Sequence, residues 1–167
     1  MASYDPRAIA NEFVKLNCGL MNQMQMQKLV FFANGWNLAI NHEPLVAGNA
    51  EAWDGGPVFR IIWNHIRDYG TNPATGQLIR PDTKKPFEVS LREEEKKIIK
   101  HVWKKYGVFS GLELSEMTHE AGTPWSNAYF GRGRNSALGQ NEIKKYFVEL
   151  ALAGRTQSTA YGCREGL

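Results

Sequence analysis

The chain has 167 residues and a formal net charge of +3, and this length fits one domain with a full hydrophobic core. Its 43% of hydrophobic and 11% of aromatic residues exclude a disordered, fully solvated chain. The mild positive charge is well short of the dense basic stripe of a dedicated nucleic-acid-binding protein. A nucleic-acid partner is therefore not expected, although the charge alone leaves the partner open.

The cysteines and the N-terminus indicate the cellular compartment in which the protein is expected. Cys18 and Cys163 lie near opposite ends of the chain, outside any CxxC or Cys/His pattern, so neither a zinc site nor a disulfide framework is indicated. The N-terminus lacks the charged and apolar regions of a signal peptide, and no apolar run approaches the ~20 residues that span a bilayer. We therefore expect a cytoplasmic protein with no membrane partner, no cofactor and no bound metal.

The first half of the chain predicts helices around a short hairpin. Asp5 and Pro6 are typical of an N-cap followed by proline at the first helical position, and Gly19 ends that helix. Residues 22–40 carry a broad apolar stripe at helical spacing, which predicts the central helix of the fold. Residues 45–53 favour a small strand or hairpin edge.

The next segment is EAWDGGPVF at residues 51–59, which runs into a helical pattern ending at Gly70. Pro57 presets the backbone for the first helical position, so we predict that the helix begins there. Residues 71–89 hold three prolines and several turn formers, which indicates a surface excursion with a short hairpin around residues 77–80.

The second half predicts four more helices. Ser90 precedes Glu93 in capping-box spacing and opens a long helix that Gly107 stops, and residues 110–113 repeat the same device. Thr123 caps the next helix, and Asn141 begins the last one. The prediction is a mainly α chain: a single compact helical domain of about seven helices with one or two small β hairpins, in residues 1–153. Residues 154–167 are predicted to form a flexible C-terminal tail.

No segment matches a known ligand-binding or catalytic pattern. DGGP lacks the spacing and lysine of a phosphate loop, the GxGxxG of a dinucleotide site and the acidic series of a calcium loop. His42, His65, His101 and His119 form no metal-ligand spacing and are predicted to be satisfied surface or boundary residues. Residues 118–120 read Thr-His-Glu, but adjacent helical side chains point about 100° apart and cannot form a relay among themselves.

One basic loop invites a binding hypothesis. GRGR at residues 131–134 alternates arginine with glycine beside two aromatic residues, as arginine-rich nucleic-acid segments do. The pattern occurs once, so a flexible interhelical loop is the favoured interpretation. Arg132 and Arg134 are retained as candidate contacts with a partner.

Four segments occur in an order and spacing typical of one family. They are QKLVFFANGWNLAI, EAWDGGPVF, LSEMTHEAGTPWSNAY and IKKYF. Together they resemble the Panacea antitoxin domain, the SocA-like group that is also found among phage-associated proteins. The resemblance runs from about residue 6 to residue 152. Each segment alone is weak, and the combination is fairly specific.

The resemblance implies a protein-binding antitoxin and no enzyme. Such domains neutralise a cognate protein toxin by direct protein–protein binding, and some relatives present the toxin to a host protease. Two alternatives stay open: a phage or mobile-element protein that inhibits a host target protein by docking, and an RNA-binding module that uses the loop at residues 131–134. The motif residues are predicted to determine the fold, with a hairpin turn at the two glycines and a second core anchor after the distal proline. They are Trp53, Gly55, Gly56, Pro57, Pro124 and Trp125.

Overall fold

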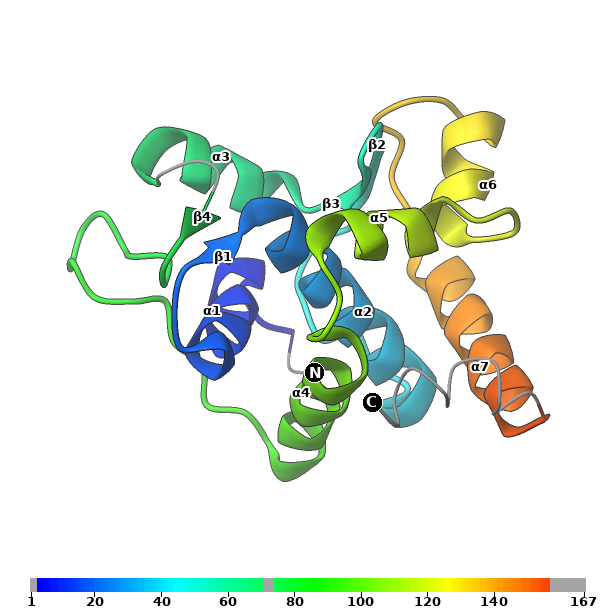
Figure 1. Ribbon diagram of the computed structural model, residues 1–167, viewed down its shortest axis with the longest axis horizontal. Coiled ribbons are helices and arrows are strands. Elements are labelled where there is room, and N and C mark those ends of the chain that lie inside the picture. Colours follow the sequence, from blue (N-terminus) through cyan, green and yellow to red (C-terminus); the bar gives the residue numbers. More distant parts are fainter. Residues whose placement is uncertain (1–2, 71–73, 157–167) are drawn as a thin grey trace.

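Seven helices, arranged around the longest of them, make up most of the molecule (Figure 1). The structure is a computed structural model that describes residues 3–70 and 74–156. Within these residues the helices are α1 (Pro6–Asn17), α2 (Gln23–Asn41), α3 (Arg60–Tyr69), α4 (Glu93–Tyr106), α5 (Gly111–His119), α6 (Pro124–Gly131) and α7 (Gln140–Thr156). The prediction of a mainly α fold of about seven helices is confirmed.

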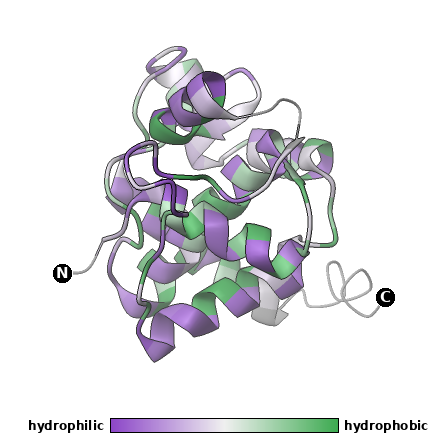
Figure 2. Ribbon diagram, turned by 90° about the vertical axis from the view of Figure 1, so that its left-hand side faces the viewer, coloured by the Kyte–Doolittle hydropathy of each residue, from purple (hydrophilic) through white to green (hydrophobic). Residues whose placement is uncertain are grey.

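The centre of the fold is α2, because α1, α4, α5 and α7 all pack against it. Every residue of α2 from Met26 to Leu38 is buried, as expected of a helix enclosed on all sides. Gly35 allows α7 to approach closely, since the Phe147 ring occupies the space that a Cβ atom at position 35 would need. The outer helices are amphipathic, and hydrophobic and hydrophilic residues alternate along them (Figure 2).

Three predicted helix starts are confirmed, and each depends on a local hydrogen bond. The Asp5 carboxylate accepts the Arg7 N–H at 2.8 Å ahead of α1. Ser110 and Glu113 exchange side-chain and backbone hydrogen bonds of 3.1 and 3.0 Å at the start of α5. The Thr123 hydroxyl accepts the Ser126 N–H at 3.2 Å at the start of α6. These side chains satisfy backbone donors that the first turn leaves unpaired.

The predicted helix start at Pro57 is wrong. Pro57 lies in a strand opposite Ala52, and α3 begins at Arg60. The cause is a contact from α2: Gln27 Oε1 accepts the Phe59 N–H at 2.8 Å, and Gln27 Nε2 donates to the Phe59 carbonyl at 3.3 Å. This pair of bonds holds Phe59 extended, so the helix starts after it.

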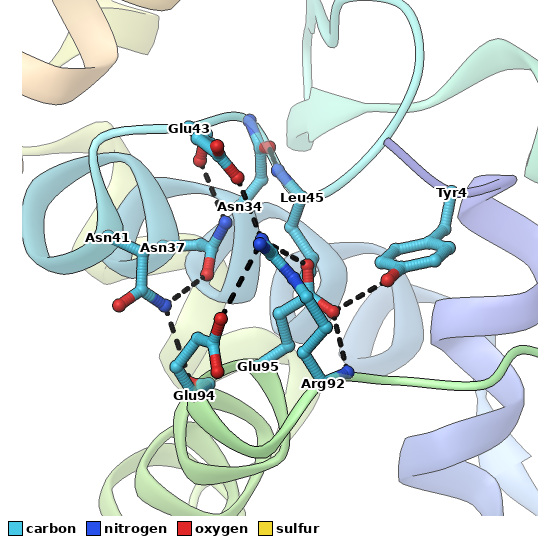
Figure 3. Close-up of polar contacts among 9 residues, drawn as sticks. All are labelled: Tyr4, Asn34, Asn37, Asn41, Glu43, Leu45, Arg92, Glu94 and Glu95. Carbon is cyan, nitrogen blue, oxygen red and sulfur yellow. Dashed lines mark hydrogen bonds and ion pairs between the residues drawn. The ribbon is translucent and has the colours of Figure 1, made fainter. Parts of the chain in front are cut away.

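The predicted start of the long helix at Ser90 is also wrong, because α4 begins after Arg92. Three consecutive glutamates at 93–95 offer three capping registers, and the structure uses the buried one. Glu95 accepts the Arg92 N–H at 2.8 Å and the Tyr4 hydroxyl at 2.6 Å (Figure 3). Ser90 therefore stays in the preceding loop.

The Glu95 carboxylate joins the start of the chain to α4. Its burial acts to raise its pKa, but hydrogen bonds from Tyr4 and Arg92 outweigh burial and lower it. Burial, followed by the hydrogen bond to Glu95, raises the pKa of Tyr4 to about 12. Arg92 also pairs with Glu43 at 2.8 Å, which ties the loop after α2 to the same cluster (Figure 3).

Two small two-stranded sheets complete the fold. One is the predicted hairpin, in which β2 (Glu51–Trp53) pairs antiparallel with β3 (Gly56–Val58). Its turn residues are Asp54 and Gly55, one position earlier than predicted, and Gly56 belongs to β3. The other sheet pairs β1 (Met21–Asn22) with β4 (Ala74–Thr75).

Residues 135–138 run along the free edge of β2. Ala52 N donates to the Ser136 carbonyl at 2.8 Å, and Leu138 N donates to the Ala50 carbonyl at 2.9 Å. This segment covers an edge strand that would otherwise be open to pairing with another chain. The basic loop that precedes it is thereby fixed beside the hairpin.

Several smaller predictions differ from the structure. The hairpin expected around 77–80 is a single bridge between Ile79 and Pro86. His65 is buried rather than at the surface or boundary, and burial lowers its pKa. Helix α7 extends to Thr156, past the predicted domain end at residue 153, and the rest of the predicted tail and Cys163 lie outside the described residues. In the part that the structure describes, no helix combines the length and apolarity needed to cross a membrane.

Candidate functional site

The backbone carbonyls of the β2–β3 hairpin, and of Phe59 directly after it, accept hydrogen bonds from side chains of three different helices. The donors are Gln27 and Lys28 of α2, Ser115 and His119 of α5, and Trp125 of α6. We call these five residues the hairpin clamp. The clamp fixes a hairpin of two three-residue strands that is too short to be stable alone.

Helix α2 holds the base of the hairpin. Lys28 is 1% exposed, and its Nζ lies 3.4 Å from the Pro57 carbonyl oxygen. Burial lowers the pKa of Lys28 to about 8. Its side chain runs under Gly56, whose φ of +116° favours glycine, and a Cβ atom there would lie 2.6 Å from Lys28 Cε. The glycine is thus required by the lysine beneath it.

Helix α5 holds the tip of the hairpin. The Ser115 hydroxyl donates to the Gly55 carbonyl at 2.6 Å. One turn later, His119 Nε2 lies 2.8 Å from the Asp54 carbonyl oxygen, and its Nδ1 lies 2.6 Å from the Ser115 carbonyl oxygen. Both ring nitrogens therefore face acceptors, and the doubly protonated ring donates to both, whereas a neutral ring donates to one.

Helix α6 completes the clamp through Trp125. Its Nε1–H donates to the Trp53 carbonyl at 2.6 Å, across 72 positions of sequence. The indole ring packs between His119 and Tyr129, with ring centroids 3.9 and 4.6 Å away. Pro124 occupies the first turn of α6, where its missing N–H costs nothing, and so sets the direction in which Trp125 enters the core.

The Asp54 side chain points outward from the hairpin tip. It accepts the Tyr129 hydroxyl at 2.7 Å and pairs with Arg134. The hydrogen bond from Tyr129, together with Arg134, lowers the pKa of Asp54. The same bond raises the pKa of Tyr129. This exposed network links the hairpin tip to α6 and to the basic loop.

The candidate contact residues of the basic loop are both engaged within the chain. Arg134 pairs with Asp54, and Arg132 donates to the Ala137 carbonyl at 2.9 Å and lies 3.6 Å from a Glu142 carboxylate oxygen. Both side chains remain about half exposed or more. The loop thus has a structural connection to the hairpin, and contact with a partner stays a prediction.

The motif residues predicted to determine the fold gather at one place. Trp53, Gly55, Gly56 and Pro57 form the hairpin, and Trp125 binds it directly. The other clamp residues were not predicted from the sequence, and the histidine among them was predicted to be a satisfied surface or boundary residue. They are Gln27, Lys28, Ser115 and His119. All four stand inside the segments that carry the family resemblance, which was the available signal.

The polar groups of the clamp form structural hydrogen bonds with backbone carbonyls. Ser115 and His119 have the residue types of a hydrolase site, but the serine hydroxyl donates to a carbonyl and both histidine nitrogens face carbonyl oxygens. A serine nucleophile needs a base that accepts its proton. Among the described residues, no group of three or more His, Cys, Asp or Glu side chains is placed to hold a metal ion.

A mainly α domain with a hairpin clamped between α2, α5 and α6 is thus the class that the structure defines. The sequence matches the family model described as "Antitoxin SocA-like, Panacea domain" over residues 26–126, the span that runs from α2 to Trp125 and contains the whole clamp. The chain belongs to this family. It is similar to Antitoxin SocA of Caulobacter vibrioides (strain NA1000 / CB15N), with 29% identity over 144 residues that cover 82% of this chain and 77% of the relative. No solved structure matches the chain.

Proposed function

We propose that this chain is a cytoplasmic antitoxin that neutralises a cognate protein toxin by direct protein–protein binding. Membership in the antitoxin family supports a role in a toxin–antitoxin pair. The observation that carries direct binding is the hairpin clamp. Polar side chains of the family motif hold the hairpin surface in one conformation. A surface that is already ordered loses little conformational entropy when it binds a partner.

The same observation favours binding over catalysis. Side chains that act as a nucleophile or a base need a free lone pair or a proton to transfer. In the clamp, Ser115 and Trp125 donate to backbone carbonyls of the hairpin, and both ring nitrogens of His119 face carbonyl oxygens. Their arrangement is that of structural anchors, and we propose that the chain is not an enzyme.

The alternatives differ in how much support they have. Inhibition of a host protein by docking would use the same kind of fixed surface, so the identity of the partner distinguishes it from an antitoxin. RNA binding through residues 131–134 is disfavoured by the pairing of Arg134 with Asp54 and of Arg132 with Glu142. Carboxylates that neutralise these arginines compete with phosphate groups.

Growth rescue tests the proposed function. The protein encoded by the gene next to that of this chain is expressed in a bacterial host, alone and together with this chain. We expect arrest by the neighbouring protein alone, restored growth in the presence of this chain, and a complex that stays intact through two purification steps. Failed rescue with both proteins soluble would contradict the antitoxin assignment and favour inhibition of a host protein.

A double substitution tests the basic loop. We expect Arg132→Ala plus Arg134→Ala to leave rescue nearly intact and to change the free energy of unfolding by less than ~1 kcal/mol, because exposed ion pairs contribute little. Growth and urea unfolding are measured in parallel. Loss of rescue by a variant that unfolds like the parent would instead place the partner contact in this loop.

A further inference from the structure

Exposed apolar side chains lie just before and at the start of α5, which approaches the start of α2. Val108 is 73% exposed and Leu112 is 65% exposed. Met24 links them to the hairpin tip: a Cβ atom at Gly111 would lie 3.1 Å from Met24 Cβ, and one at Gly55 would lie 3.7 Å from Met24 Cε. A cluster of large apolar side chains in solvent marks an interaction surface.

This apolar cluster continues into carboxylates. Glu116 follows Leu112 by four residues, so both lie along one side of α5. Glu120 is the C-cap residue directly after the helix, and both glutamates are exposed. Neither of these glutamates has an ion-pair partner among the described residues. Residues 107–131 contain three glutamates and no lysine or arginine, although the chain as a whole carries +3. The segment that contains α5 therefore carries only acidic formal charges.

We propose that the α5 face, made of Met24, Val108, Leu112, Glu116 and Glu120, docks a basic and partly apolar surface of the protein toxin. The inference rests on the proposed function, because it names the surface through which neutralisation occurs. Charge complementarity selects this occupant, since opposite potentials steer association and like charges oppose it. A second copy of the chain would bring glutamates against glutamates, and RNA would bring phosphates against them.

Contacts with the hairpin and with α2 hold the α5 face in place. Ser115 and His119, on the adjacent side of the same helix, bind the hairpin tip at 2.6 and 2.8 Å. The glycine at 111 lets the start of α5 approach α2, because a Cβ atom there would lie 3.0 Å from Gln25 N. The face is thus held on both sides, and a partner meets it already formed.

Charge reversal tests the proposal. The dissociation constant for the protein encoded by the neighbouring gene is measured at low and high salt with the parent and with Glu116→Lys plus Glu120→Lys. We expect the double variant to bind roughly 30-fold or more weakly, and its affinity to lose most of its salt dependence. Lysines near the C-terminus of α5 suit the helix dipole, so the variant should fold. The matched control, Glu88→Lys plus Glu149→Lys, changes two exposed glutamates elsewhere by the same charge and should bind within about 3-fold of the parent.

A second pair of variants tests the apolar part. Leu112→Asp should weaken binding roughly 100-fold if Leu112 fills a pocket on the partner. Ile40→Asp, at another exposed apolar helix position, should not. Parent-like binding by both α5 variants, with the parent itself binding, would overturn the inference and leave the proposed function standing. No binding by the parent would overturn both. Self-association of the parent that Leu112→Asp abolishes would make the face a contact between copies and would also overturn the inference.

Discussion

Trp125→Ala is expected to lower the free energy of unfolding by about 3 to 5 kcal/mol, the range for removing a large buried aromatic side chain. Trp125 is buried, and its ring packs against His119 and Tyr129. The substitution also leaves the Trp53 carbonyl without its donor. Urea unfolding followed by far-ultraviolet circular dichroism measures the change without relying on the fluorescence of the deleted indole.

Two further variants separate packing from hydrogen bonding at this position. Trp125→Phe keeps much of the ring but removes the Nε1–H, so a loss of about 1 to 3 kcal/mol is expected from the unpaired carbonyl. Trp63→Ala is the matched control, because Trp63 is only half-buried and packs from α3 against Trp53. An alanine variant that melts with the parent would show that Trp125 contributes nothing to the core and is free to contact a partner.

The helix starts show which parts of the fold a sequence can predict. Asp5, Ser110 and Thr123 each cap a helix through a bond to a residue two or three positions away. Such bonds depend on neighbours in the sequence, so residue type and spacing are sufficient to predict them. The apolar stripe of α2 likewise depends only on residues close in the sequence. The prediction that this segment forms the central helix is confirmed.

The two misplaced starts were decided by distant residues. Phe59 is held extended by Gln27, 32 positions earlier, and Glu95 is held by Tyr4, 91 positions earlier. A proline after two glycines fits a strand as well as a helix start, and three successive glutamates fit three registers. Helix propensity does not decide where these two helices start, and tertiary contacts do.

Individual residues of the candidate site were predictable from the sequence, but the contacts between them were not. Trp53 and Trp125 were both predicted as anchors, but the bond between them spans 72 positions and no periodicity implies it. His119 was judged against its sequence neighbours, whereas its second partner is the Asp54 carbonyl on the hairpin. Side chains that bind backbone carbonyls leave no spacing rule, because any residue can supply the carbonyl.

Lys28 is the least expected member of the clamp. A protonated amine that is 1% exposed and has one long contact to the Pro57 carbonyl is costly to bury. Burial accordingly lowers its pKa from the ordinary value of 10.5 to about 8. Below pH 8 the lysine is protonated in both the folded and the unfolded chain. Between about pH 8 and 10.5 the folded chain binds fewer protons, so stability rises with pH across this window.

Lys28→Met is expected to abolish that rise. In the parent, Lys28 adds roughly 2 to 3 kcal/mol to the free energy of unfolding between pH 7 and pH 10, because each unit of pKa shift corresponds to about 1.4 kcal/mol. Methionine fills similar space without a charge, so its variant retains only the pH dependence of the other groups, such as Tyr4. Urea unfolding of both proteins at the two pH values gives the double difference, and Lys145→Met, at an exposed position, should give none. Equal pH dependence in the parent and Lys28→Met would show that the amine keeps its full charge in the fold, solvated from within the clamp.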